Sequence, residues 1–518
     1  MSDTPSDSTN FTGFRALFWP IHRHELKKLI PMLLIFFFIT LGYNILRMLK
    51  DTLVVTAKDS GAEVIPFIKV WLMFPGSIFL AFIYTRLNNH LSRERVITLM
   101  FSMFLLFFFL FTFILFPHRE SLRLDHLADS MASVLPAGCK GLVAMVRHWI
   151  FSGFYVMSEL WGNIVLFVLF WGFANQVTKV GESKRFYALF GFGGNISGII
   201  GGWVSISVSR IPFLPWIPYG TNAWEQTLMI LVSITLVGGL CALLLFKWLI
   251  RNVVSTSEAE STSPTNEKKE RHSMRKNMRH LLSSKYLIFM GIIVLAYNLA
   301  INLVEVLWKH EMHALFPNPT EYHTYFSEVS TIIGVVATLS SLLISGQSIR
   351  RFGWTFTALA TPIIVFVTSA AFFFLFFTKD SHSAFYYSLF GVSPLALVVW
   401  VGSFQNIACR AAKYTVYDAT KEMAFVPLDK KTIVKGKAAI DGVINRMGKS
   451  SGSFIHQSLL FFFSSLSASA PWVAAILFTV VGCWFWATKK LGKEFNELTQ
   501  STTTPVPSYS TKTEAQPA

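Results

Sequence analysis

Long apolar runs separated by short charged stretches dominate this chain of 518 residues. The runs are about 20 residues long and unbroken, which is typical of membrane-spanning helices and not of the short alternating strands of a β-barrel. About twelve spans are expected, near residues 29-48, 65-85, 96-116, 149-173, 186-208, 227-249, 286-308, 327-346, 354-377, 384-408, 452-465 with a backward extension, and 471-488. The pattern therefore predicts an all-α polytopic membrane protein.

Basic residues in the loops predict the orientation of these spans. Lys and Arg recur in the N-terminal segment, in every second loop and after the last run, whereas the intervening loops are mixed or nearly uncharged. Loops rich in Lys and Arg stay in the cytoplasm, so both termini and the even-numbered loops are predicted to be cytoplasmic. The same alternation accounts for most of the net charge of +16, and nucleic-acid binding is not needed to explain it.

A long basic loop divides the spans into two sets of six, an arrangement typical of two-lobed transporters. The predicted organisation is a cytoplasmic N-terminal tail over 1-28, an N-terminal six-helix lobe over 29-250, a basic cytoplasmic linker over 251-284, a C-terminal six-helix lobe over 285-490 and a disordered tail over 491-518.

Composition excludes several other classes of protein. Charged residues make up 14% of the chain and hydrophobic residues 53%, whereas a soluble domain has roughly a quarter charged residues. A soluble globular enzyme and an intrinsically disordered protein are both excluded. The four cysteines are far apart and form no CxxC pair, and no HExxH motif or nucleophile–base set is visible. We therefore predict no metal site and no cofactor, and a membrane enzyme lacks support.

Charged residues inside the apolar runs are the first candidates for function, because a charge at the centre of a bilayer costs a few kcal/mol. Glu159 lies within FYVMSELWGNIVLF, Glu305 within AINLVEVLWK and Lys69 within IPFIKVWLMFPG. A position at the water-facing edge of a span is the alternative for the two glutamates. Arg47 and Lys50 end the first run, where snorkelling to the membrane surface is the alternative.

The stretch 410–453 carries the densest positive charge. A helix beginning near residue 434 would place Lys437, Asp441 and Lys449 near one face, with Arg446 close by at the mouth of the eleventh span. An ordinary cytoplasmic loop is the alternative, and it suffices for Lys430 and Lys431. The segment GVINRMGKS is not a phosphate-binding P-loop, since five residues separate its glycines where that motif has four.

These charges together suit the transport of a polyanion by alternating access. The cations would hold phosphate groups, and the two intramembrane carboxylates would form salt bridges that break and re-form between the two states, or would carry a proton.

Several sequence blocks are similar to a known family. The chain resembles the bacterial and plastid-type ATP/ADP translocases, or nucleotide transporters, and is similar to chlamydial members. The blocks are WPIHRHELKKLIPM (19-32), LKDTLVVT (49-56), GAEVIPFIKVW (61-71), SELWG (158-162), FWGFANQVTK (170-179), ESKRFYALFG (182-191), NLVEVLWK (302-309), YDATKEMAFVPLD (417-429) and KGKAAIDGVINRMGKSSGS (435-453).

The resemblance implies a major-facilitator-like fold with 6+6 helices, and it marks particular charges. Lys50, Glu159, Glu305 and Lys449 match the family's functional positions. Many exchangers read R-D-T-K-D where this chain has Met48 and Leu49 between Arg47 and Lys50, and Ser451 stands where a glycine is common. The complete predicted set is Lys50, Glu159, Glu305, Lys437, Arg446 and Lys449, supported by Arg47, Asp51, Lys69 and Asp441.

The resemblance also implies a function. We expect exchange of ATP for ADP, or broader nucleotide exchange, in the inner membrane of an intracellular bacterium that imports ATP from its host. Proton-coupled import of nucleoside triphosphates and NAD/ADP exchange are the alternatives. The expected partners are a nucleotide, protons in the first alternative, and the lipid bilayer; neither nucleic acid nor a protein partner is expected.

Overall fold

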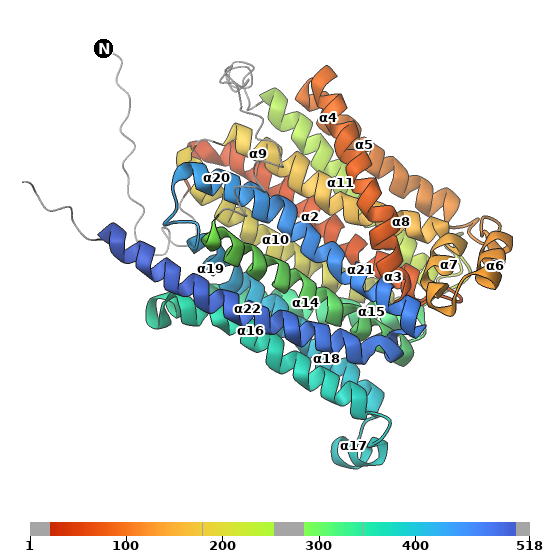
Figure 1. Ribbon diagram of the computed structural model, residues 1–518. Helices are drawn as coiled ribbons and strands as arrows, with labels where there is room; N and C mark the ends of the chain where they lie inside the picture. Colours follow the sequence, from red (N-terminus) through yellow and green to blue (C-terminus); the bar gives the residue numbers. More distant parts are fainter. Residues whose placement is uncertain (1–20, 179, 253–283, 344, 504–518) are drawn as a thin grey trace, which may run out of the picture.

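The structure is a computed structural model that describes residues 21–178, 180–252, 284–343 and 345–503. Long helices packed side by side build the described part, and no strand occurs in it. Figure 1 shows that most of them run in roughly the same direction, as the helices of a membrane bundle do.

Six crossings form the first half of the chain, and three of them contain a π-helical segment (η2, η3 and η5); the label η is also used for short 3-10 helices. The six crossings are α2 (Leu26–Val55), α3–η2–α4 (Val64–Phe67, Ile68–Met73, Phe74–His90), α5–η3 (Arg93–Leu110, Phe111–Leu115), α8–η5–α9 (Trp149–Leu160, Trp161–Phe170, Trp171–Val177), α10 (Val180–Ser209) and α11 (Ala223–Asn252). Short helices α6 (Asp125–Val134) and α7 (Lys140–Arg147) lie between the third and fourth crossings.

The second half repeats this layout. Its crossings are α14 (Lys285–Leu315), α15 (Pro319–Leu343), α16 (Ser345–Thr378), α18–η6–α19 (Pro394–Ala412, Lys413–Tyr417, Asp418–Met423), α20–η7–α21 (Lys430–Ala439, Ile440–Ile444, Asn445–Phe463) and α22 (Leu466–Thr503). A short helix α17 (Ser383–Phe390) precedes α18.

Eleven helices of the described chain are long and apolar enough to cross a membrane. They match eleven of the predicted spans, so the all-α polytopic fold class is confirmed. The remaining prediction, near 452-465 with a backward extension, corresponds to the continuous helix α20–η7–α21. This helix packs against α14 and α22 inside the bundle, but its Lys, Gly and Ser residues make it too polar to be recognised as a span by composition.

The predicted start of the tenth span and the predicted start of the C-terminal tail are wrong. The span predicted over 384-408 begins only at Pro394, because Gly391 ends α17 in the left-handed conformation (φ 69°) and Ser393 caps the next helix. Residues 491–503, predicted to belong to the disordered tail, continue α22. Most of the predicted linker over 251-284, most of the N-terminal tail and the rest of the C-terminal tail lie outside the described residues.

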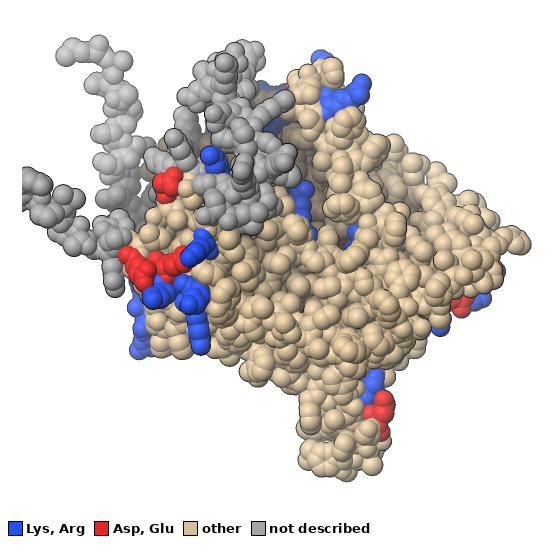
Figure 2. All heavy atoms as spheres, in the orientation of Figure 1, with Lys and Arg blue, Asp and Glu red and all other residues tan. Residues whose placement is uncertain are grey.

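The bundle has two ends, which we name by the segments that reach them. The tail end is where α2 and α14 begin and where α11 and α22 end; the far end is where α2 and α14 end. Figure 2 shows a hollow in the surface between the α4–α5 pair and the helix α20–α21, with Lys and Arg side chains inside it. This hollow separates parts of the two halves.

The halves pack closely toward the far end. A β-carbon at Gly138 in the first half would collide with the backbone of Leu460 on α21, and one at Gly202 on α10 would collide with Thr331 on α15. Phe67 and Phe461 also meet there across the two halves, with their ring centroids 6.3 Å apart. Contact between the halves is therefore tight at the far end and extends along α10 and α15.

Candidate functional site

Six charged side chains form a continuous series of ion pairs in the interior of the bundle. We call this series, Glu159–Lys50–Asp51–Lys309–Glu305–Arg410, the charge chain. Lys50 Nζ lies 3.0 Å from Glu159 Oε1 and 3.0 Å from Asp51 Oδ1. Lys309 Nζ lies 2.9 Å from Asp51 Oδ2 and 3.0 Å from Glu305 Oε1, and Arg410 Nη2 lies 3.1 Å from Glu305 Oε2.

Four helices position these groups, two from each half. Glu159 lies on α8, while Lys50 and Asp51 are neighbours on α2. Glu305 and Lys309 stand four residues apart on α14, so they share one face of that helix. The charge chain passes from the first half to the second at the ion pair between Asp51 and Lys309. This ion pair is therefore a direct polar link between the halves.

Burial differs along the charge chain. The side chains of Lys50, Asp51 and Lys309 are 3%, 2% and 4% exposed, whereas those of Glu159, Glu305 and Arg410 are 23%, 17% and 19% exposed. Removing one partner of a buried pair leaves an uncompensated charge and costs about 3–5 kcal/mol. The centre of the charge chain is thus held rigidly, while the two ends of the charge chain, at Glu159 and Arg410, have access to solvent and to a ligand.

Further contacts surround the charge chain. Lys69 on η2 donates a hydrogen bond of 3.0 Å to Asn302 Oδ1 on α14, a second polar link between the halves. The ammonium group of Lys50 also lies 3.9 Å from the ring centroid of Tyr155, within the range of a cation–π interaction.

Several cations near the charge chain are not neutralised by a carboxylate. Within the described residues, Arg47, Lys69 and Lys449 have no recorded ion pair. Lys449 on α21 is exposed, and it is close enough to Glu159, Lys413 and Arg410 for electrostatic interaction. Because the charge chain itself contains three cations and three carboxylates, these additional cations give the site a surplus of positive charge.

The structure brings together most of the predicted site residues. Lys50, Asp51, Glu159 and Glu305 belong to the charge chain, and Lys69, through Asn302, and Lys449 interact close to it. Arg47 interacts electrostatically with Tyr43 and Tyr414.

Lys437 and Asp441 lie in a different ion-pair group. Lys437 Nζ is 2.5 Å from Glu422 Oε2, and Asp441 Oδ1 is 2.8 Å from Lys421 Nζ. Arg446 is exposed, with no recorded ion pair among the described residues. The α-helical period predicted one face for Lys437, Asp441 and Lys449, but the π-helical segment η7 contains Asp441 and shifts the register of the residues that follow it.

Lys309 and Arg410 were not among the predicted site residues. Their signal in the sequence was weak because the predicted spans ended at residues 308 and 408, just before each of them. The helices in fact continue to Leu315 and, through η6 and α19, to Met423. The spacing of four residues between Glu305 and Lys309 was the clue that could have identified Lys309.

Comparison with known proteins agrees with this architecture. A model of the TLC ATP/ADP transporter family matches residues 4–495. The chain belongs to this family. It is 43% identical over 489 residues to ADP,ATP carrier protein 1 of Chlamydia muridarum (strain MoPn / Nigg), covering 94% of this chain and 92% of that protein. It is 40% identical over 475 residues to the chloroplastic ADP,ATP carrier protein 1 of Arabidopsis thaliana, covering 91% and 74%.

Solved transporters share the fold of this family member at low sequence identity. A bacterial homologue of the iron transporter ferroportin, in an inward-facing state, aligns with a TM-score of 0.56 and 12% identity over 91% of this chain and 98% of that one. The xylose transporter XylE from E. coli, in an inward-open conformation, aligns with a TM-score of 0.50 and 13% identity over 91% and 99%. The predicted major-facilitator-like architecture is confirmed, and the protein is a transporter.

Proposed function

We propose that this protein exchanges ATP for ADP across a bacterial inner membrane by alternating access, and that it imports ATP from a host cell. The charge chain is the observation that carries the proposal, since it links the two halves beside cations that have no carboxylate partner. The names of the chlamydial and plastid relatives support the choice of nucleotides. The alternation of basic loops supports cytoplasmic termini, so that the tail end faces the cytoplasm.

The ion pairs suggest how the substrate drives the cycle. Phosphate groups that enter beside Lys449, Arg47 and Lys69 would compete with carboxylates for the cations of the charge chain. Withdrawing Lys309 from Asp51 would weaken the bridge between the halves and allow the far end to open. Without a nucleotide the bridge re-forms, which favours exchange over one-way movement.

Proton-coupled nucleotide import is a second candidate, favoured by one observation. Glu159 is partly exposed and has a single cation, Lys50, within ion-pair distance among the described residues. Such a carboxylate could take up a proton when Lys50 turns to a phosphate group. NAD/ADP exchange remains an alternative choice of substrate for the same site.

Transport assays separate these functions. Labelled ATP, ADP, GTP, UTP and NAD are offered to cells that express the protein, with and without a preloaded counter-nucleotide and an uncoupler. We expect ATP and ADP uptake that requires the counter-nucleotide and persists with the uncoupler. Uptake that stops when the uncoupler is added, and that does not depend on a preloaded counter-nucleotide, would favour proton symport instead. Lys50→Ala, which removes the cation shared by Glu159 and Asp51, should abolish uptake at equal abundance in the membrane.

A further inference from the structure

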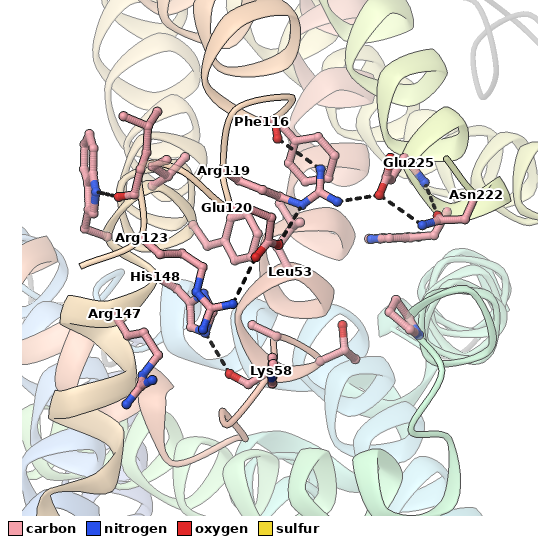
Figure 3. A pocket seen from close by; sticks show the side chains of 18 residues that line it. Leu53, Lys58, Phe116, Arg119, Glu120, Arg123, Arg147, His148, Asn222 and Glu225 are labelled. Carbon is pink, nitrogen blue, oxygen red and sulfur yellow. Dashed lines mark hydrogen bonds and ion pairs between the residues drawn. The ribbon is translucent and has the colours of Figure 1, made fainter. Parts of the chain in front are cut away.

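A cavity of about 300 Å³ lies at the far end of the bundle, in a region that the charge chain does not use. It is bordered by the end of α2, by the segment between η3 and α6, by the start of α8 and by the start of α11 (Figure 3). Leu53, which lines it, follows Asp51 by two residues on α2. The cavity therefore lies just beyond the charge chain along that helix.

Each arginine of this cavity's lining is paired with carboxylates, Arg147 with Asp125 and Asp129, so Lys58 is the lining cation without an ion pair among the described residues. Four basic side chains, Lys58, Arg119, Arg123 and Arg147, line it together with two carboxylates, Glu120 and Glu225. Burial, with smaller contributions from Arg123 and Arg147, lowers the pKa of His148 below its ordinary value, which favours the neutral imidazole. An unpaired cation in a concave lining attracts anions more strongly than the same charge on an exposed surface.

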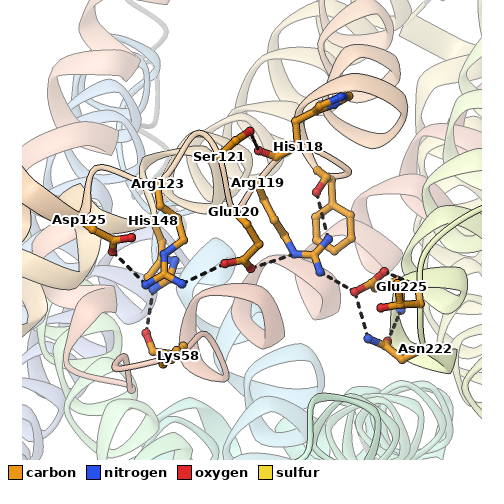
Figure 4. Close-up of polar contacts among 12 residues, drawn as sticks. Lys58, His118, Arg119, Glu120, Ser121, Arg123, Asp125, His148, Asn222 and Glu225 are labelled. Atoms are coloured by element: carbon orange, nitrogen blue, oxygen red, sulfur yellow. Dashed lines mark hydrogen bonds and ion pairs between the residues drawn. The ribbon is translucent and has the colours of Figure 1, made fainter.

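The arginines of the lining are already held in place. Figure 4 shows a row of ion pairs that runs from Asp125 through Arg123, Glu120 and Arg119 to Glu225. Arg123 is held by Glu120 at 3.0 Å and by Asp125 at 2.9 Å, yet its Nε is buried with no hydrogen-bond partner. The paired arginines therefore keep their positions and need little further ordering when an anion enters the cavity.

Lys58 is the least constrained cation of the cavity. Its side chain is exposed and has no recorded ion pair within the described part of the chain. Its backbone carbonyl accepts a 2.8 Å hydrogen bond from His148 Nε2, which fixes the loop that carries it (Figure 3). The ammonium group can therefore turn toward a ligand while its backbone stays in place.

Contacts between the halves lie next to the same cavity. Trp224 lines it and packs against His323 of α15, with ring centroids 5.4 Å apart. His323 Nδ1 lies 3.2 Å from Thr52 Oγ1 on α2, close to Asp51. An anion held in the cavity thus lies beside contacts that must separate before the far end can open.

We propose that this cavity is a vestibule that captures the phosphate chain of a nucleoside di- or triphosphate before the far end opens. The inference rests on the proposed function and adds a second, earlier binding site to it. Cavities for complete small ligands span about 300–1,000 Å³. A volume at the lower limit suits a phosphate chain better than a complete nucleotide.

Charge reversal at Lys58 tests the vestibule. In cells expressing the full chain, Lys58→Glu should raise the KM for external ATP about three- to tenfold, leave the maximal rate within twofold and weaken the dependence of KM on salt, because an entry-site charge acts mainly on capture. Lys140→Glu is the matched control: it makes the same charge change at an exposed site of the same end, outside the cavity lining. It should leave the KM for ATP unchanged.

Tripolyphosphate binding to the purified full-length protein gives an independent readout. Titration calorimetry should show weaker binding to Lys58→Glu than to the wild type and to Lys140→Glu. Equal KM values in all three proteins, or equal increases in both variants, would overturn the vestibule while leaving the proposed exchange intact. Absence of exchange by the wild type, together with tripolyphosphate binding that depends on Lys58, would overturn the proposed function and retain the anion site.

Discussion

Lys309 is the residue on which the link between the two halves depends most directly. It contacts Asp51 of the first half and Glu305 of its own helix. We expect Lys309→Ala to lower the exchange rate at least tenfold and to destabilise the fold by up to about 3–5 kcal/mol, because Asp51 and Glu305 each lose a buried partner. Exchange in proteoliposomes and the midpoint of thermal unfolding measure the two effects separately.

Lys379 provides a matched control for this prediction. It pairs at 2.6 Å with Glu311, which is 2% exposed, but both residues belong to the second half. Lys379→Ala should lower thermal stability and keep the exchange rate per folded molecule within twofold. An equal loss of exchange in both variants would show that the bridge between the halves has no special role in transport.

Lys449 and Lys437 were predicted together, and the structure separates them. Lys449 has no recorded carboxylate partner in the described chain, whereas Lys437 is paired with Glu422. We expect Lys449→Ala to raise the KM for nucleotide about tenfold, the effect of losing a hydrogen bond to a charged group. Lys437→Ala should change it less than twofold. A larger increase in KM for Lys437→Ala than for Lys449→Ala in uptake assays would instead place the nucleotide-binding site toward the tail end.

At the scale of single residues, the sequence predicted members of the candidate site where a charge stands out against apolar neighbours on both sides. Glu159 and Glu305 were recognisable for this reason, as was Lys69. Lys309 was missed because it lies one residue beyond a predicted span. Hydropathy does not distinguish a helix that leaves the membrane from a helix that continues into a hydrated interior. Ion pairing across the bundle depends on how the helices pack, which a sequence pattern does not contain.

Among the elements, the short segment η4 (Ala137–Cys139) makes a contact that depends on the absence of a side chain. Gly138 there packs against the backbone of Leu460 on α21, and the neighbouring Cys139 is 1% exposed. A valine at position 138 should push η4 and α21 apart at the far end. We expect Gly138→Val to favour the conformation in which this end is open.

Cys139 is a built-in reporter for that change. In a background with Cys241 and Cys483 replaced by serine, an impermeant maleimide should label Gly138→Val at least fivefold faster than the parent protein. Gly153→Val is the control, because a β-carbon there meets no atom within 4 Å. Labelling of Cys139 that is equally slow in both variants would mean that the contact with α21 does not keep the far end closed.

The helix α20–η7–α21 shows what the pattern of apolar residues can and cannot predict for an element. Its predicted position was nearly correct at the apolar end, where Leu459, Leu460 and three phenylalanines lie. Toward the tail end, Gly448 and Gly452 pack against Asn298 and Asn302 of α14. Small and polar residues serve such close contacts well, and they lower the hydropathy by which a span is recognised.

For the whole molecule, the two halves touch at the far end and are separated by the hollow seen in Figure 2. The apolar core of the second half includes residues of the first, such as Ile65 and Phe67. Together these features describe a transporter closed at its far end. The count of spans and their division into two sets could be read from the sequence, but which end is closed could not, because the same helices must also pack in the opposite state.

Exchange requires this closed end to open, so a cross-link across it should stop transport. Arg210 and Glu328 form an exposed ion pair of 3.3 Å between the halves at the far end, and an exposed pair contributes at most about 1 kcal/mol. Replacing both by cysteine, in the background without Cys241 and Cys483, should therefore preserve exchange. Linking the two thiols with a short reducible reagent should lower exchange at least tenfold, and reduction should restore it.

A control pair within one helix distinguishes a blocked cycle from simple damage. Lys493 and Glu497 form an exposed ion pair on α22, and cysteines at these positions, treated with the same reagent, link residues that stay together throughout the cycle. This variant should exchange nucleotides at the same rate before and after cross-linking. Unchanged exchange in the cross-linked Arg210→Cys/Glu328→Cys protein would contradict alternating access through the far end, because a substrate could then pass without the two halves separating there.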